Sequence, residues 1–156
     1  MKTTLNKIRQ HAPCSDGWKK LLESLGKSKS DDEPIFILTI LESNGLDDAL
    51  WALRAVEGHD REIRLYAVWC ARQVQHLMTD PRSVAAIDAA EAYANGTITT
   101  TQLVAARAAA SAAAMAAAAS AGAWAAARAA ATWDATWDAA RAAQEVELRR
   151  ICGGKA

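Results

Sequence analysis

The tract from Ala105 to Ala143 limits most strongly what this chain can fold into, because about two-thirds of its positions are alanine. Alanine has the highest intrinsic helix propensity, and the tract contains no proline. Before Thr97 the composition is mixed and the expected helices are short. We therefore predict an all-α fold, in which a bundle of short helices is followed by a long alanine-rich helix.

A single helix from Thr99 to Ile151 would be about 80 Å long at a rise of 1.5 Å per residue. A compact chain of this size has a radius of gyration of only about 15 Å. We expect a bend or a hairpin near Ser120–Gly122, and a projecting rod is the alternative. We treat residues 1–96 and 97–156 as two helical regions of a single domain.

The alanine faces of the tract require a close partner. Small side chains allow two helix backbones to approach closely and to gain many weak dispersion contacts. We therefore expect a helix packed against the tract, either from the same chain or from a second copy in a homodimer.

Helix start and stop signals divide the rest of the chain into short helices. One helix is expected after Ser15-Asp16. Two more are expected over the β-prone Ile35–Leu41 and over Leu46–Val56, and two further helices begin at Asp60 and at Pro81. Thr99 and Gln102 have capping-box spacing just before the tract. In the fourth of these helices, a buried stripe is predicted at Ile63, Ala67, Cys70, Val74 and Leu77.

The charges of the 156 residues balance, with 18 basic and 18 acidic side chains. This neutrality argues against a dedicated DNA-binding protein, which normally carries a basic excess. Three widely spaced cysteines fit a reducing compartment better than a disulfide framework. We found no signal peptide and no apolar run suited to crossing a membrane. We expect a soluble, cytoplasmic protein.

The first candidate site is a repeat of Ala-Thr-Trp-Asp inside the tract. A spacing of four places the two tryptophans on one helical face and the two aspartates on another. One interpretation is packing tryptophans beside a solvated charged stripe, which is the more common arrangement. The other is a partner-binding surface, since exposed tryptophan and arginine anchor interfaces. This candidate surface comprises Trp124, Trp133, Asp134, Trp137, Asp138 and Arg141.

The second candidate is a pocket for a phosphate or carboxylate in the central helices. Paired guanidinium groups bind such anions in a bidentate manner. A structural ion network that ties helices together has the same sequence signature, and it is the preferred interpretation. The residues concerned are Arg54, Asp60, Arg64, Arg72 and His76.

Neither a metal site nor an enzyme is predicted. His11 and Cys14, and Cys70 and His76, have spacings that match no compact zinc signature. The chain contains no phosphate loop, dinucleotide-binding glycine pattern, HExxH motif or nucleophile elbow. The acidic pairs at helix starts are explained by capping and the helix dipole. We expect no cofactor and no catalytic residue.

The segments GWKKLL, GLDDALWALRAV and LYAVWCARQVQHLM begin at Gly17, Gly45 and Leu65. Together with the alanine-rich helix, they resemble a family of alanine-rich, immunity-five-like proteins of bacteria and phages. The resemblance extends from about Leu5 to Cys152. It implies a small cytoplasmic protein that binds and neutralises a toxin, and it supplies no catalytic residue.

Three functional hypotheses follow. The first is a non-enzymatic inhibitor that neutralises a toxin or another protein partner by occluding its surface. The second is a phage-type anti-defence protein, either an inhibitor resembling an anti-CRISPR or one that sequesters a nucleotide signal through Arg54, Arg64 and Arg72. The third is a scaffold or oligomer joined through its alanine seams.

Overall fold

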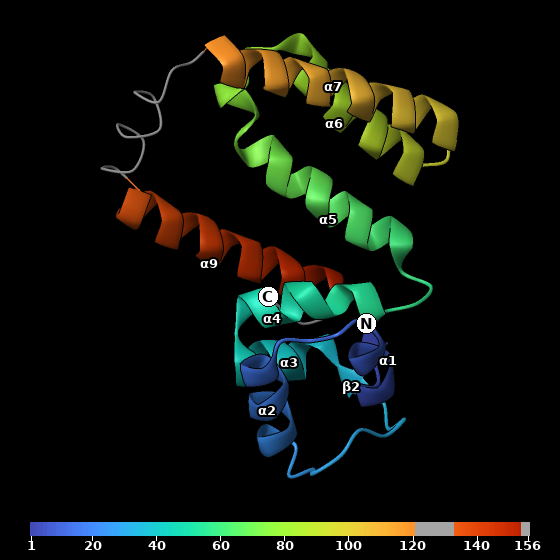
Figure 1. Ribbon diagram of the computed structural model, residues 1–156, viewed down its shortest axis with the longest axis vertical. Coiled ribbons are helices and arrows are strands. Elements are labelled where there is room, and N and C mark those ends of the chain that lie inside the picture. Colours follow the sequence, from blue (N-terminus) through green and yellow to red (C-terminus); the bar gives the residue numbers. More distant parts are fainter. Residues whose placement is uncertain (121–132, 154–156) are drawn as a thin grey trace. The chain divides into compact units, whose positions relative to one another are not determined.

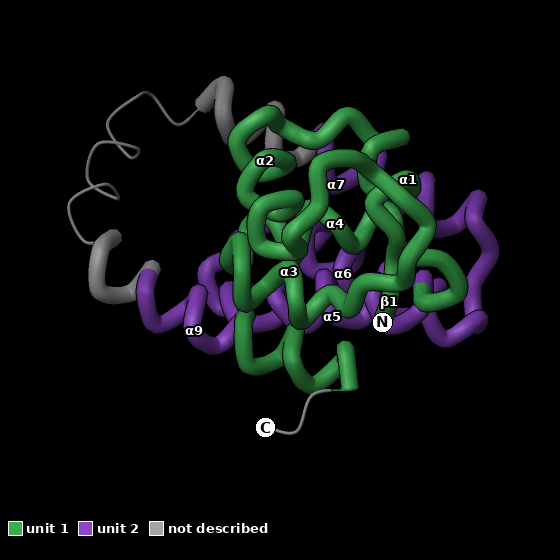
Figure 2. Tube along the Cα trace, turned by 90° about the horizontal axis from the view of Figure 1, so that it is seen from below, with its two compact units in different colours: residues 1–59, 145–156 green, residues 60–144 purple. Residues whose placement is uncertain are grey.

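The computed structural model describes residues 1–120 and 133–153, with side chains for residues 1–112 and 138–153 (Figure 1). The described part is all-α apart from two strands of two residues each, which confirms the predicted fold class. The chain divides into two compact units, coloured separately in Figure 2. Unit 1 comprises residues 1–59 and 145–156, and unit 2 comprises residues 60–144. These boundaries do not coincide with the change of composition near Thr97.

Unit 1 contains short helices and a small antiparallel sheet. Its elements are β1 (Lys2–Thr3), α1 (Leu5–Gln10), α2 (Ser15–Ser24), β2 (Ile35–Phe36), α3 (Ile37–Asn44), α4 (Leu46–Ala52), the 3₁₀ turn η1 (Leu53–Ala55) and the end of α9 (Trp133–Ile151). The two strands pair with Lys2 opposite Phe36 and Thr3 opposite Ile35. The helix expected from Ile35 therefore starts two residues later, at Ile37. The helix expected as far as Val56 instead narrows to a 3₁₀ turn after Ala52.

The core of unit 1 joins the beginning and the end of the described chain. Leu5, Ile37, Ile40 and Leu148 are the largest fully buried side chains among the described residues. The Met1 ammonium donates a hydrogen bond to the Cys152 carbonyl oxygen at 3.2 Å. The last turns of α9 are thus an integral part of unit 1.

Unit 2 consists of α5 (Asp60–Gln73), the 3₁₀ turn η2 (Gln75–Leu77), α6 (Pro81–Ala94), α7 (Thr100–Ser120) and the first part of α9. Local signals set these boundaries as predicted. The Asp80 carboxylate accepts from the Arg82 backbone N–H at 2.8 Å, and Pro81 is the first helical residue of α6. The Thr99 backbone N–H donates to the Gln102 side-chain oxygen at 2.8 Å, and the Thr99 hydroxyl accepts from the Gln102 N–H at 3.3 Å. This reciprocal pair is the expected capping box.

The alanine-rich helix α7 packs along α6, which is itself rich in alanine, and this is the most extensive helix pairing among the described elements (Figure 1). Leu103 of α7 and Ile87 of α6 are buried. The expected partner for the first part of the tract is therefore supplied by the same chain. Ser120 is the last residue of α7, and the rest of the expected break, residues 121–122, lies outside the described residues.

The predicted buried stripe of α5 is wrong: Ile63 and Cys70 are only half-buried, and Ala67, Val74 and Leu77 are exposed. The helix ends at Gln73, and the following 3₁₀ turn has a different periodicity, so the 3.6-residue pattern does not continue. Val74 and Leu77 are 46% and 68% exposed. Tyr66 and Val68 are buried instead, and the Tyr66 hydroxyl donates to the Gln144 carbonyl oxygen at 3.2 Å.

No helix in the described ranges combines the length and the apolar character that a membrane crossing requires.

Candidate functional site

Two helices of unit 1 each present a tryptophan to one pocket. On α2 and its N-cap, Cys14, Gly17, Trp18 and Leu21 follow the three-four spacing that brings side chains to one face. On α4, Asp48, Trp51 and Ala52 follow the same spacing. Helix α3 contacts both α2 and α4, and it contributes Ile40 and Asn44 to the wall of the pocket.

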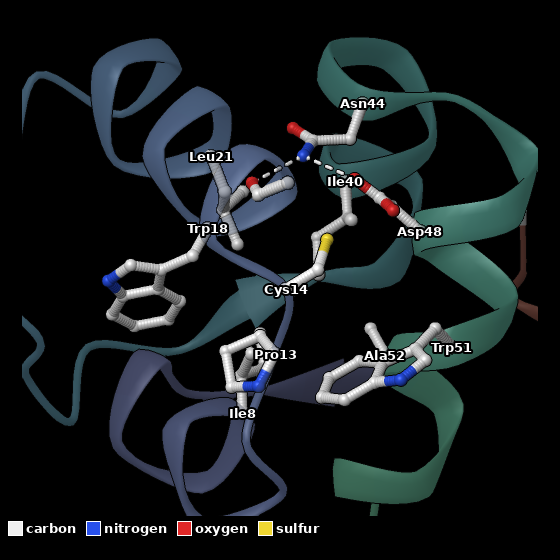
Figure 3. Close-up of a pocket in the computed structure, with 11 residues that line it drawn as sticks. Ile8, Pro13, Cys14, Trp18, Leu21, Ile40, Asn44, Asp48, Trp51 and Ala52 are labelled. Carbon is white, nitrogen blue, oxygen red and sulfur yellow. Dashed lines mark hydrogen bonds between the residues drawn. The ribbon is translucent and has the colours of Figure 1, made fainter.

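We call this cavity the Trp18–Trp51 pocket. It has a volume of about 90 Å³, and its exposed lining is mainly apolar. In the view of Figure 3, the two tryptophans lie on either side of Cys14 and Pro13, and Asn44 and Asp48 lie at the end away from Ile8. The lining residues are Ile8, Pro13, Cys14, Gly17, Trp18, Leu21, Ile40, Asn44, Asp48, Trp51 and Ala52.

A hydrogen-bond network fixes the polar end of the pocket (Figure 3). The Asn44 side-chain amide donates one hydrogen to the Gly17 carbonyl oxygen and the other to Asp48 Oδ2, both at 2.8 Å. The amide oxygen of Asn44 accepts from the Ser43 hydroxyl at 2.8 Å. Asn44 thus ties α3 to both α2 and α4, and it holds the Asp48 carboxylate in one position.

Gly17 allows the carboxylate to approach α2 closely. A Cβ atom at this position would lie 2.6 Å from Asp48 Oδ2 and 3.1 Å from the Cys14 sulfur. Contacts this short require one of the atoms to move. The absence of a side chain at Gly17 is therefore part of the construction of the pocket.

An arginine stacks on one of the pocket tryptophans. The Arg54 guanidinium carbon lies 4.5 Å from the centre of the Trp51 ring, and Arg54 Nε donates to the Trp51 carbonyl oxygen at 3.0 Å. The cation–π contact and the hydrogen bond restrict the rotamers of both side chains. Arg54 remains exposed, so an ordered cation stands beside the pocket.

The structure brings together only some of the residues predicted to bind an anion. Asp60 and Arg64 line a shallow cavity of about 410 Å³ in unit 2, between α5, α6 and α7. The Arg64 guanidinium lies 4.7 Å from the centre of the Tyr93 ring. Arg72 and His76 do not line this cavity, and Arg54 belongs to unit 1.

Arg72 is the centre of an ion network between α5 and α6. Its guanidinium donates to Glu91 at 2.6 Å, to Asp88 at 2.7 Å and to the Gln75 side chain at 2.7 Å. The bonds to Glu91 and Asp88 raise the pKa of Arg72 above its ordinary value. This arrangement is a structural ion network that ties two helices together, as in the preferred interpretation of the arginine cluster. His76 is exposed in η2.

The candidate surface in the alanine-rich tract is described only at its end. Trp124 lies outside the described residues, and so do the side chains of Trp133, Asp134 and Trp137, although these three belong to α9. Asp138 is exposed. Arg141 is half-buried and interacts with another group.

No three His, Cys, Asp or Glu side chains are grouped to hold a metal ion within the described ranges. Cys14, Cys70 and Cys152 form no disulfide bond, and burial raises the pKa of Cys152. No protein-family model, curated protein or solved structure matches this chain.

Sequence reasoning assigned no site to Trp18, Trp51 or Asp48. It explained the acidic pairs at helix starts, to which Asp48 belongs, by capping and the helix dipole. The available signal was periodic, because positions 14, 17, 18 and 21 share one helical face, as do positions 48, 51 and 52. The approach of these two faces depends on tertiary packing, which the spacing alone does not specify.

Proposed function

We propose that this chain is a non-enzymatic binding protein that neutralises a protein partner by covering its surface, with the Trp18–Trp51 pocket as one anchor. The observation that carries the proposal is a small apolar pocket between two tryptophans, beside an ordered arginine. The sequence resemblance to immunity proteins supports the same class of function, and it would make the partner a toxin.

The size of the pocket favours a side chain of a partner over a whole metabolite. Pockets for drug-sized ligands usually have volumes of about 300–1,000 Å³, and an engineered cavity of about 150 Å³ binds benzene. A pocket of about 90 Å³ accepts one smaller group. A protein partner can insert one such group while the rest of its interface covers the surrounding surface.

The composition of the pocket wall supports an interface. Tryptophan and arginine are enriched among the residues that dominate binding energy, and these residues are surrounded by contacts that exclude water. Trp18 and Trp51 are half-buried, so part of each indole remains available. Because Arg54 is already ordered on Trp51, little side-chain entropy would be lost when a partner binds.

The nucleotide-binding alternative has less support. A phosphate on Arg72 would have to displace the carboxylates of Glu91 and Asp88, which already occupy its guanidinium group. Asp60 and Arg64 share a cavity that Arg107 also lines, so an acidic group accompanies the two arginines of this site. A thermal-shift series with linear and cyclic nucleotides tests this alternative, which predicts a saturable stabilisation that Arg64→Ala removes.

Affinity capture from cells of the source organism, compared across matched variants, tests the main proposal. We expect one protein to be retained by the wild type at near-stoichiometric yield and to be reduced at least tenfold by Trp51→Ala. Arg54→Glu changes only an exposed group and should also reduce retention. Trp69→Ala, in unit 2, is the control that removes a tryptophan elsewhere, and it should retain the partner. Circular dichroism checks that each variant keeps its helical content.

Equal retention by the wild type, Trp51→Ala and Arg54→Glu would refute the pocket as an anchor. A fourfold variant at Trp133, Asp134, Trp137 and Arg141 tests the surface that was predicted from the alanine-rich tract. If only this variant loses the partner, that surface, and not the pocket, is the binding site.

A further inference from the structure

We propose that the Trp18–Trp51 pocket receives a lysine side chain of the partner, with its methylene groups against the apolar wall and its ammonium group on Asp48. This inference rests on the proposed function, because the lysine belongs to the partner protein. It specifies the chemistry of the anchor, which the proposed function leaves open.

The charge of the pocket favours a cation. Among the described residues that line it, Asp48 alone carries a charge. Asp48 Oδ2 accepts from Asn44, whereas Oδ1 accepts no hydrogen bond from the described part of the chain. A carboxylate oxygen without a donor, at the end of an apolar cavity, is complementary to a positively charged donor.

The Asn44 side chain, which lies beside Asp48, has no amide hydrogen left to bind an anionic ligand. Both amide hydrogens of Asn44 are used, one by Gly17 and one by Asp48, and its oxygen accepts from Ser43. The pocket therefore offers no amide donor to a carboxylate or a phosphate. At this polar end, the side-chain hydrogen-bonding capacity that remains is the acceptor capacity of the Asp48 carboxylate.

The geometry of the carboxylate favours lysine over arginine. Arginine binds a carboxylate best through two parallel hydrogen bonds, which require both oxygens. Asp48 Oδ2 is engaged by Asn44 and lies so close to α2 that a Cβ atom at Gly17 would be only 2.6 Å away. A single oxygen without a hydrogen bond from the described residues suits the compact ammonium group of lysine, which binds as a point charge.

The apolar wall suits the stem of the same side chain. Lysine commonly buries its methylene groups along apolar surface while its ammonium reaches a polar group. Ile8, Leu21 and Ile40 provide aliphatic contacts, and the tryptophan rings attract a cation through their π electrons. Arg54 does not line the pocket, and its exposed charge is screened by solvent.

A titration with n-butylammonium, which reproduces the lysine side chain, tests the inference without the partner. The signals to follow are the indole N–H resonances of Trp18 and Trp51, assigned with Trp18→Phe and Trp51→Phe. We expect saturable shifts of both signals with n-butylammonium. Binding of 1-butanol and of n-propylguanidinium should be at least fivefold weaker.

Asp48→Asn keeps the shape of the side chain and removes its charge, so it should weaken n-butylammonium binding at least tenfold. Asp47→Asn is the matched control, because Asp47 is an exposed neighbour that does not line the pocket. It should bind like the wild type. Equal binding of 1-butanol and n-butylammonium, or unchanged binding by Asp48→Asn, would overturn the inference and would leave capture through the pocket standing.

Competition with the captured protein identifies the source of the amine. If a partner lysine fills the pocket, saturating n-butylammonium should release the partner from the immobilised wild type, and 1-butanol should not. If n-butylammonium binds the pocket but the partner is retained, the occupant is not a partner lysine and this inference is wrong. If n-butylammonium binds and no protein is captured at all, the proposed function fails, and the pocket remains a site for a free amine.

Discussion

Replacing Gly17 with alanine should destabilise this protein, although alanine is the better helix former. Within a helix the exchange usually stabilises by about 0.5–1 kcal/mol, because glycine loses more backbone freedom on folding. At this position, however, the new Cβ atom would lie 2.6 Å from Asp48 Oδ2. The carboxylate must move away, and its 2.8 Å hydrogen bond from Asn44 is then lost or stretched.

The balance of these two effects sets the expected magnitude. A hydrogen bond to a charged group contributes about 1.5–3 kcal/mol to stability. Asp48 is half-buried, so solvent replaces part of the interaction and the lower end of that range applies. After the gain in helix propensity is subtracted, Gly17→Ala should reduce the free energy of unfolding by about 1 kcal/mol.

A double-mutant cycle with Asp48→Ala isolates this effect. In the Asp48→Ala background the obstructing carboxylate is absent, so Gly17→Ala should stabilise by about 0.5–1 kcal/mol. The coupling free energy between the two positions should therefore be about 1.5–2 kcal/mol. Urea unfolding followed by circular dichroism measures all four proteins. If Gly17→Ala stabilises both backgrounds equally, the close approach of the carboxylate to α2 is refuted.

Three further changes test other parts of the structure. Thr3→Val leaves the Ala55 carbonyl without its buried hydroxyl donor and should lower the urea-unfolding free energy by about 1–3 kcal/mol; a loss below 0.5 kcal/mol would contradict the buried bond. Arg72→Met should cost no more than about 1 kcal/mol in the same assay, because its acidic partners are well exposed. The Arg82 guanidinium lowers the pKa of Asp80, so carboxyl NMR should show titration below pH 3.8, and Arg82→Ala should raise that pKa. Folding lowers the pKa of Asp80, so the ionised carboxylate stabilises the folded state at any pH above the pKa of the unfolded chain. This stabilisation is lost as the pH falls through the pKa of the folded state. The difference in stability between the wild type and Arg82→Ala should therefore disappear under strongly acidic conditions.

Local sequence signals predicted helix boundaries well. The caps at Asp80 and Thr99 form as expected because each needs only a side chain and a backbone group a few residues apart. The buried stripe of α5 failed in two ways. Tyr66 and Val68 are buried in place of Ala67, and the helix ends at Gln73, before Val74 and Leu77. The change to a 3₁₀ turn at that point has no simple signal in the sequence, since neither proline nor glycine marks it.

The candidate site was less predictable than the helices. The periodic faces that carry Trp18 and Trp51 are readable from spacing, but such faces usually indicate ordinary core packing. What distinguishes them is the void between two helices and the Asp48 carboxylate that lines it and is held by Asn44, and both depend on how separate elements meet. Arg72 shows the reverse case, because its sequence context allowed a ligand site and the structure fills its guanidinium group with carboxylates.

Unit 1 is built from two segments, with residues 60–144 inserted between them. During translation residues 1–59 are made before this insert, but the helix turn that brings Leu148 into their core follows it. A nascent chain must therefore keep apolar surface uncovered while the whole insert is made. The unit that holds the Trp18–Trp51 pocket acquires its complete core only after Leu148 has been made, so a product that terminates within the insert would be a substrate for chaperones and proteases.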